Sequence, residues 1–146
     1  MERRIYYFKA SHAIAEHDGI IEHSGGLTGI KDSGQIESIL EHIQNDLYYP
    51  TFEEKLTHLV FSFIKLHAFN DGNKRSGIAL GAYFLKINGY DYSIPTFTKE
   101  LENIVVWVAE GLINKCFLQK IITELISDLE LSEITKLELI LTVTAD

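Results

Sequence analysis

Two long apolar segments joined by a short polar loop constrain the fold of this 146-residue chain more than any other feature. Residues 56–66 (LTHLVFSFIKL) have few polar side chains, and residues 76–87 (SGIALGAYFLKI) are apolar almost all round. A helix that is apolar on every side is expected to lie inside a domain. The sequence therefore predicts two buried central helices, over residues 53–66 and 73–88, joined by the loop 67–75.

This loop, HAFNDGNKR, brings an imidazole, a carboxylate and two cations into nine residues. Its Asp-Gly-Asn turn can start the second helix, with Asp71 or Asn73 as the cap. The free N–H groups of a first helical turn, with the positive end of the helix dipole, attract an anion. Lys74 and Arg75 are unfavourable for the helix at this end. We therefore expect a bound anion, with phosphate as the first choice, to offset their charge.

Asp71 and His67 extend this interpretation from binding to chemistry. A carboxylate beside a phosphate is a natural ligand for Mg²⁺, which takes one or two carboxylates together with phosphate oxygens. His67 can accept the proton of an attacking hydroxyl. Each of these residues alone also fits an ordinary role, as a helix cap, a core histidine or an exposed cation. Their combination favours a phosphate site.

The loop is similar to the signature of the Fic/Doc (Fido) superfamily, H-x-F-x-(D/E)-(G/A)-N-(G/K)-R. The matching residues are His67, Phe69, Asp71, Gly72, Asn73 and Arg75. Lys74 is characteristic of the Doc (death-on-curing) branch, and Ile78 stands where Fic adenylyltransferases carry a second arginine. Residues 25–40 (GGLTGIKDSGQIESIL) and 84–92 (FLKINGYDY) also resemble the Doc branch. The resemblance covers roughly residues 10 to 115.

The resemblance implies a Doc-like toxin of a toxin–antitoxin pair. Such a protein would transfer the γ-phosphate of ATP, with Mg²⁺, to a serine or threonine hydroxyl of a protein. The family expectation is elongation factor Tu as the target and a Phd-like antitoxin as the inhibitor. The implied catalytic residues are His67, Asp71, Lys74 and Arg75, the implied nucleotide-binding residues are Gly72, Asn73, Lys74 and Arg75, the magnesium ligand is Asp71, and the structural anchor is Phe69.

Two alternatives stay open. Fic-like adenylylation (AMPylation) of a protein hydroxyl is supported by the Gly72-Asn73 pair together with His67 and Asp71. A catalytically silent binding module is the other, although the complete set of loop residues argues against it.

Residues 98–103 (TKELEN) fit the short inhibitory Fic pattern (S/T)-x-x-x-E-(G/N), but a capped helix start is favoured there. Inhibition is therefore expected from another chain.

Composition limits the remaining classes of function. A net charge of −8 disfavours direct nucleic-acid binding, although it permits ATP at a local basic spot. The single cysteine, Cys116, excludes an intrachain disulfide, and its apolar neighbours predict a core position. Neither a signal peptide nor an apolar run of about 18 residues is evident, so we expect a cytoplasmic protein without membrane contact.

The rest of the chain predicts one all-α Fido-like domain over residues 1–146, a compact bundle of about six helices with minor short strands. Further helices are expected over residues 11–23, from Asp32, from Thr96 or Thr98, and over 117–129. The last three of these helices are each predicted to bury one stripe of apolar side chains. The stripes are Ile36, Ile39, Leu40, Ile43 and Leu47; Leu101, Ile104, Val105, Val108 and Leu112; and Leu118, Ile121, Ile122, Leu125 and Leu129. Short extended pieces are expected at 5–8, at 90–94 and in the tail of 116–146, where residues 137, 139, 141 and 143 alternate.

Three histidines occur in the first predicted helix, His12, His17 and His23. Neither 12 and 17 nor 17 and 23 are four residues apart, so these pairs do not share a helix face at ligand spacing. No acidic or cysteine partner completes a metal set. The sequence therefore gives no zinc site in this segment.

Overall fold

The computed structural model describes residues 4–145, and all regular structure within that range is helical. The all-α prediction is confirmed. The elements are α1 (Ala10–Ser24), α2 (Ser33–His42), α3 (Phe52–Lys65), α4 (Asn73–Ile87), the 3₁₀ helix η1 (Asp91–Ser93), α5 (Ile94–Ala109), α6 (Lys115–Ser127) and α7 (Glu133–Thr144).

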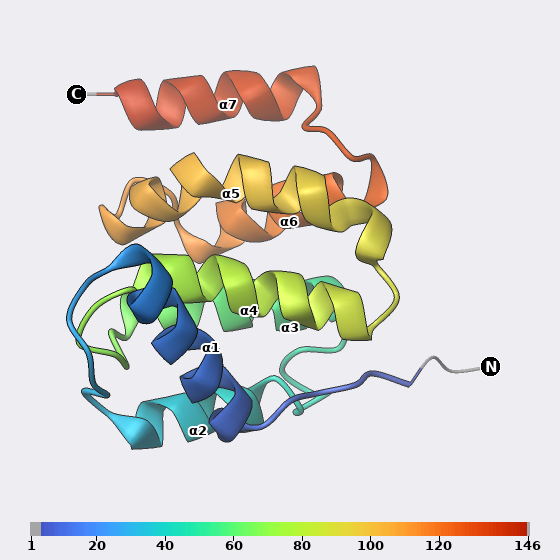
Figure 1. The fold of residues 1–146 in the computed structure, drawn as a ribbon. Coiled ribbons are helices and arrows are strands. Elements are labelled where there is room, and N and C mark those ends of the chain that lie inside the picture. Colours follow the sequence, from blue (N-terminus) through green and yellow to red (C-terminus); the bar gives the residue numbers. More distant parts are fainter. Residues whose placement is uncertain (1–3, 146) are drawn as a thin grey trace.

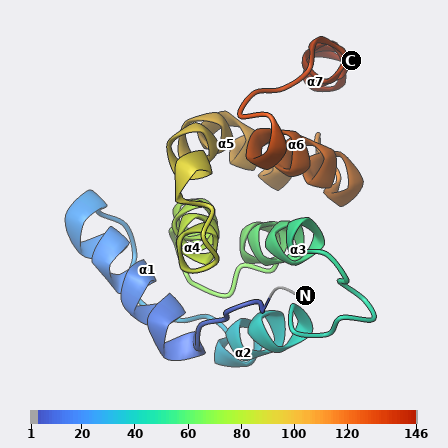
Figure 2. The ribbon, with the colours of Figure 1, turned by 90° about the vertical axis from the view of Figure 1, so that its right-hand side faces the viewer.

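The helices stack in layers around the central pair α3 and α4 (Figure 1). Viewed from the side, α1 and α2 cover one side of this pair and α5 and α6 cover the other, with α7 outermost (Figure 2). Leu56, Leu59, Val60 and Phe63 of α3 are completely buried, as are Leu80 and Phe84 of α4. The most apolar segments therefore form the middle layer, and the loop between them opens at one end of the bundle.

None of the three predicted extended pieces forms a strand in the described part of the chain. Residues 5–8 lack a partner strand, and the side chain of Asn88 takes that place. Its Oδ1 accepts from the Tyr6 N–H at 2.8 Å, and its Nδ2 donates to the Tyr6 carbonyl at 3.0 Å. The N-terminal segment is thus held at the end of α4 by one amide.

The other two strand predictions fall on helices. Residues 91–93 turn into η1, and Pro95 lies in the first turn of α5, where a missing N–H removes no helical hydrogen bond. Helix α5 therefore begins at Ile94, before Thr96 and Thr98, and residues 98–103 lie inside it. The tail forms α7, which begins where the Ser132 hydroxyl accepts from the Thr135 N–H at 3.1 Å. This cap starts a helix across residues whose short alternation had suggested a strand.

Several residues assigned to the core are exposed. Leu47 is 93% exposed, and Leu112, Leu129 and Cys116 are exposed as well. Leu47, Leu112 and Leu129 each lie beyond the end of the helix whose stripe they were expected to extend. Cys116 lies in the first turn of α6 on its outer face. No helix among residues 4–145 has both the length and the apolar character to cross a membrane.

Close packing of α4 depends on the glycine at position 81. A Cβ at Gly81 would lie 2.8 Å from Cζ of Phe97 and 3.0 Å from Cγ2 of Val60. At Gly77 the nearest atom would be Cγ1 of Ile64 at 3.4 Å, which is an ordinary contact. The two positions therefore differ in the space available for a methyl group.

We expect Gly81→Ala to lower the free energy of unfolding by about 1 kcal/mol or more, because overpacking outweighs the better helix propensity of alanine. Gly77→Ala is the matched control, and it should be neutral or stabilising by up to about 1 kcal/mol. Urea denaturation of both variants measures this difference. Equal shifts in both would contradict the packing argument.

The face of α3 turned towards α6 carries a half-buried histidine, His58. Its Nδ1 lies 2.8 Å from Nζ of Lys115, and the ring stacks on Tyr49 with centroids 4.4 Å apart. Burial, and then the positive charge of Lys115, lowers the pKa of His58 from its ordinary value of 6.5 to about 4. The His58 imidazole is therefore protonated in the folded protein only at a much lower pH than in the unfolded chain.

It follows that the contribution of His58 to stability is complete above pH 6.5 and is lost as the pH falls from 6.5 to 4. In that window the unfolded state binds more protons than the folded state. We expect the difference in urea midpoint between the wild type and His58→Gln to be constant above pH 7. Below pH 7 the midpoint of the wild type should fall relative to that of His58→Gln. Parallel curves for the two proteins from pH 7 to pH 4 would show that the effect is absent.

Candidate active site

The predicted site loop leaves α3 and enters α4 through two residues with left-handed backbone. His67 has φ +49° and is exposed, and Gly72, at the N-cap position of α4, has φ +77°. Glycine adopts the left-handed region at little cost, whereas other residues are rarely found there. The expected cap by Asp71 or Asn73 is absent, because no side chain caps α4.

The side chain of Asn73 instead closes the loop on itself. Its Oδ1 accepts from the Phe69 N–H at 3.1 Å, and its Nδ2 donates to the Phe69 carbonyl at 3.0 Å. Phe69 is completely buried, with its ring stacked on His17 at 3.8 Å and next to Phe63 at 6.1 Å. The Phe69 ring therefore fixes the middle of the loop to the core.

Residues 25–32, a segment distant in sequence, run alongside the loop. The Ala68 carbonyl accepts from the N–H groups of Lys31 and Asp32 at 2.8 and 3.0 Å. The Asn70 N–H donates to the Gly29 carbonyl at 3.1 Å, so that Ile30 and Phe69 form an isolated antiparallel bridge. The glycine-rich segment thus supports the loop backbone from outside.

The same segment holds the Asp71 carboxylate. Its Oδ2 accepts from the Leu27 N–H at 3.0 Å, and its Oδ1 accepts from the Gly72 N–H at 2.8 Å. These two bonds, the Leu27 bond first, lower the pKa of Asp71, and the charges of Arg75 and Lys74 act in the same direction. Asp71 is therefore ionised at neutral pH, with its orientation set by two backbone donors.

Arg75 is also held by this segment, since its Nη1 donates to the Gly25 carbonyl at 3.0 Å. A Cβ at Gly26 would lie 2.7 Å from Oδ2 of Asp71 and 3.1 Å from Nη2 of Arg75, and Gly26 has φ +125°. Both the backbone conformation and the available space therefore require glycine at this position. Lys74 is exposed beside these groups.

The loop residues surround a pocket of about 310 Å³ at the N-terminal end of α4. Ile64 of α3 and Ala109 of α5 supply its apolar wall. The loop supplies the rest of the lining, namely His67, Asn70, Asp71, Gly72, Asn73, Lys74 and Arg75. The structure thus gathers all the predicted site residues around one pocket, except Phe69, which is buried and does not line it.

The donor set restricts how this pocket could hold Mg²⁺. Among residues 4–145, no cluster of three or more His, Cys, Asp or Glu side chains could hold a metal ion. Asp71 is a single ionised carboxylate, and each of its oxygens keeps a free lone pair after accepting one N–H. This fits Mg²⁺ that completes its shell with phosphate oxygens and water. The residues do not form an independent metal cage.

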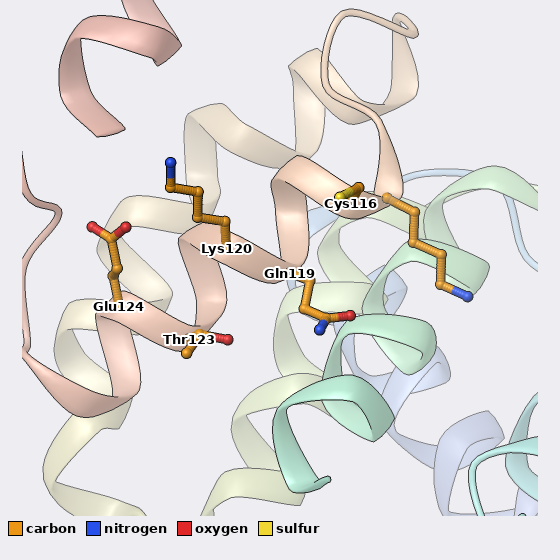
Figure 3. A pocket seen from close by; sticks show the side chains of 6 residues that line it. Cys116, Gln119, Lys120, Thr123 and Glu124 are labelled. Atoms are coloured by element: carbon orange, nitrogen blue, oxygen red, sulfur yellow. The ribbon is translucent and has the colours of Figure 1, made fainter. Parts of the chain in front are cut away.

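A larger hollow, of about 650 Å³, lies along α6 (Figure 3). Its lining comes from one helix and consists of Lys115, Cys116, Gln119, Lys120, Thr123 and Glu124. Lys120 is engaged with Glu138 of α7 at 2.8 Å. No residue of the site loop lines this hollow. Its size alone does not indicate a catalytic site. The smaller pocket, with its ionised carboxylate, imidazole and cations, is the candidate site.

Sequence reasoning overlooked His17, which it considered only as a zinc ligand. His17 is completely buried in α1, and its Nε2 lies 2.7 Å from the Asp71 carbonyl oxygen. A signal was present, because Ala13, His17 and Ile21 are spaced four apart and form the buried face of α1. That spacing predicts a buried histidine, but not what it contacts.

We expect Asn73→Ala to lower the free energy of unfolding by about 2 kcal/mol, because it leaves a buried N–H and a buried carbonyl of Phe69 without partners. Asn70→Ala is the matched control in the same loop. The Asn70 amide makes a single exposed bond, to the Thr28 carbonyl at 3.0 Å, and its loss should cost well under about 1 kcal/mol. Urea denaturation compares the two. A cost for Asn70→Ala as large as that for Asn73→Ala would contradict the proposed weight of the Asn73 bridge.

Comparison with known proteins gives independent findings. The model of the Fic/DOC family matches residues 7–85 of this chain. A protein named Protein kinase doc, from Escherichia phage P1, is 36% identical over 106 residues, which span 69% of this chain and 80% of that protein. A protein named Toxin Doc, from Mycolicibacterium smegmatis, is 30% identical over 105 residues, which span 69% of this chain and 78% of that protein.

Proposed function

The chain belongs to the Fic/Doc family, and we propose that it acts as a Doc-type protein kinase. Its relatives support a Doc-like toxin with kinase-type transferase activity. The finer proposal is transfer of the γ-phosphate of ATP to a serine or threonine hydroxyl of a protein. We treat residues 1–146 as one Fido-like domain that carries this activity.

One observation favours phosphoryl transfer over adenylylation. The position three residues after Arg75 is Ile78, whose side chain packs against the hydrophobic core. Fic adenylyltransferases carry a second arginine at that position. In this chain no guanidinium can extend from it towards the pocket. Lys74 provides the alternative cation, on the first turn of α4. The cations available for phosphate thus come from adjacent positions at the helix end.

The loop residues take the following roles in this proposal. His67, exposed at the rim of the pocket, accepts the proton of the target hydroxyl. The hydroxyl oxygen bonds to the γ-phosphorus as the bridging P–O bond to the β-phosphate breaks, and ADP leaves. Mg²⁺, when bound through Asp71 and the nucleotide, would offset charge on the phosphates.

The start of α4 would hold the nucleotide. The N–H groups of the first turn, beginning at Asn73, would face the anion in the way typical of helix N-termini, whereas the Gly72 N–H is engaged with the Asp71 carboxylate. The Asn73 side chain is engaged with Phe69, so its part in binding is through the backbone. Lys74 and Arg75 would neutralise negative charge that moves onto the leaving phosphate oxygens. Phe69 anchors the loop from the core.

The proposal extends to partners and place of action. Elongation factor Tu is the proposed target, and a Phd-like antitoxin is the proposed inhibitor, since the relatives named Toxin Doc and Protein kinase doc suggest a toxin–antitoxin setting. Both ATP and such a target would be met in the cytoplasm. No direct contact with nucleic acid or a membrane is part of this function.

The proposal is tested by incubating the purified chain with Mg²⁺, elongation factor Tu and a bacterial lysate, using ATP labelled at the γ-phosphate in one sample and at the α-phosphate in another. We expect label from the γ-phosphate only. His67→Ala should lower the rate by about 100-fold or more, which is the usual contribution of a general base. Asp71→Ala should abolish transfer, and circular dichroism should show both variants folded.

Other results would redirect the assignment. Label from the α-phosphate would establish the Fic-like adenylyltransferase. No label in either sample would favour the silent binding module. Full activity in His67→Ala or Asp71→Ala would show that the site has been assigned to the wrong residues.

A further inference from the structure

The imidazole of His17 lies directly beneath the site loop. It is completely buried in α1, its ring is nearly parallel to that of Phe69, at 4° and 3.8 Å, and its Nε2 lies 2.7 Å from the Asp71 carbonyl oxygen. It therefore contacts the loop at two residues, Phe69 and Asp71. The ring does not line the loop pocket.

The groups around the His17 ring show which of its nitrogens donates a hydrogen bond. A carbonyl oxygen can only accept, so Nε2 carries a proton and donates to Asp71. The other nitrogen, Nδ1, faces Oδ1 of Asp18 at 3.3 Å, and that carboxylate is 65% exposed. Stacking fixes the plane of the ring, and the bond to Asp71 fixes its rotation. The donor at Nε2 is therefore held at one place under the loop.

This donor binds the backbone of the residue whose carboxylate matters for transfer. The Asp71 carbonyl and carboxylate belong to the same residue, and the carboxylate is oriented by the N–H groups of Leu27 and Gly72. If the carbonyl shifts, the carboxylate loses its alignment with both donors. The bond from α1 thus complements the Asn73 bridge, which fixes the loop at Phe69.

We propose that His17 is a positioning residue that, by donating from Nε2 to the Asp71 carbonyl, sets the orientation of the Asp71 carboxylate in the pocket. This rests on the proposed function for its effect on turnover, but the orientation itself does not. A histidine that only filled the core would contribute packing against Phe69. The positioning role requires the donor as well, and suitable substitutions separate the two contributions.

Three variants make this separation. His17→Phe keeps an aromatic ring on Phe69 and removes the donor. His17→Gln removes the ring and keeps an amide N–H at the distance of Nε2. His17→Asn is its matched control, because its shorter amide reaches only the Nδ1 position.

We expect His17→Phe and His17→Asn to lower kcat by about tenfold or more, with the KM for ATP changed less than about threefold, since small misplacements of catalytic groups reduce turnover strongly. His17→Gln should recover most of the turnover. NMR chemical shifts of the Leu27 and Gly72 amide protons give a second measurement that needs no activity. These shifts should change in His17→Phe and His17→Asn and stay near the wild-type values in His17→Gln, because the two N–H bonds that orient the Asp71 carboxylate are preserved there.

The outcomes are decisive in each case. Unchanged Leu27 and Gly72 amide shifts in both His17→Phe and His17→Asn overturn the proposal, as does an equal loss of turnover in His17→Gln and His17→Asn. If His17→Phe fails to fold, the Gln and Asn pair still decides. If the wild type transfers no phosphate, the proposed function fails, while the Leu27 and Gly72 amide shifts still test the positioning role.

Discussion

The double hydrogen bond between the Asn73 amide and the backbone of Phe69 is the interaction on which the site depends. It satisfies both polar groups of a buried peptide position, where an unpaired group would be costly. It also fixes the path of the loop into α4, so that the first turn of that helix faces the pocket. Lys74 and Arg75 follow immediately, and their position at the helix N-terminus is a consequence of this turn.

The loop is nevertheless not a self-sufficient motif. Its outer side is covered by residues 25–32 and its inner side by α1, which place backbone donors on Asp71 and a buried ring under Phe69. Overall the chain carries a net charge of −8, but the loop combines one ionised carboxylate with two cations. This local balance suits a bound phosphate with a divalent cation, and segments that are far apart in sequence hold the charged groups in place.

The fold followed the sequence where apolar spacing was long and continuous. Helices α3 and α4 occur within a residue of their expected positions because each has a long, continuous set of buried residues along its length. The strand predictions at residues 90–94 and in the tail were wrong because alternation over five to seven residues is compatible with either structure. At residues 90–94 a proline in the first helical turn decided the outcome, and in the tail the Ser132 cap did. Leu47, at the end of a stripe, was misplaced because its helix ends before it.

The sequence by itself determined which chemical groups meet in the loop, because they are neighbours along the chain. It also determined the central helices that hold them, because burial of long apolar segments leaves few alternatives. Only the tertiary structure decided that Leu27 binds the Asp71 carboxylate, that Gly25 binds Arg75 and that His17 binds the Asp71 carbonyl. These partners are separated by 44 to 54 residues. Their meeting depends on how the helices pack, and no local pattern specifies it.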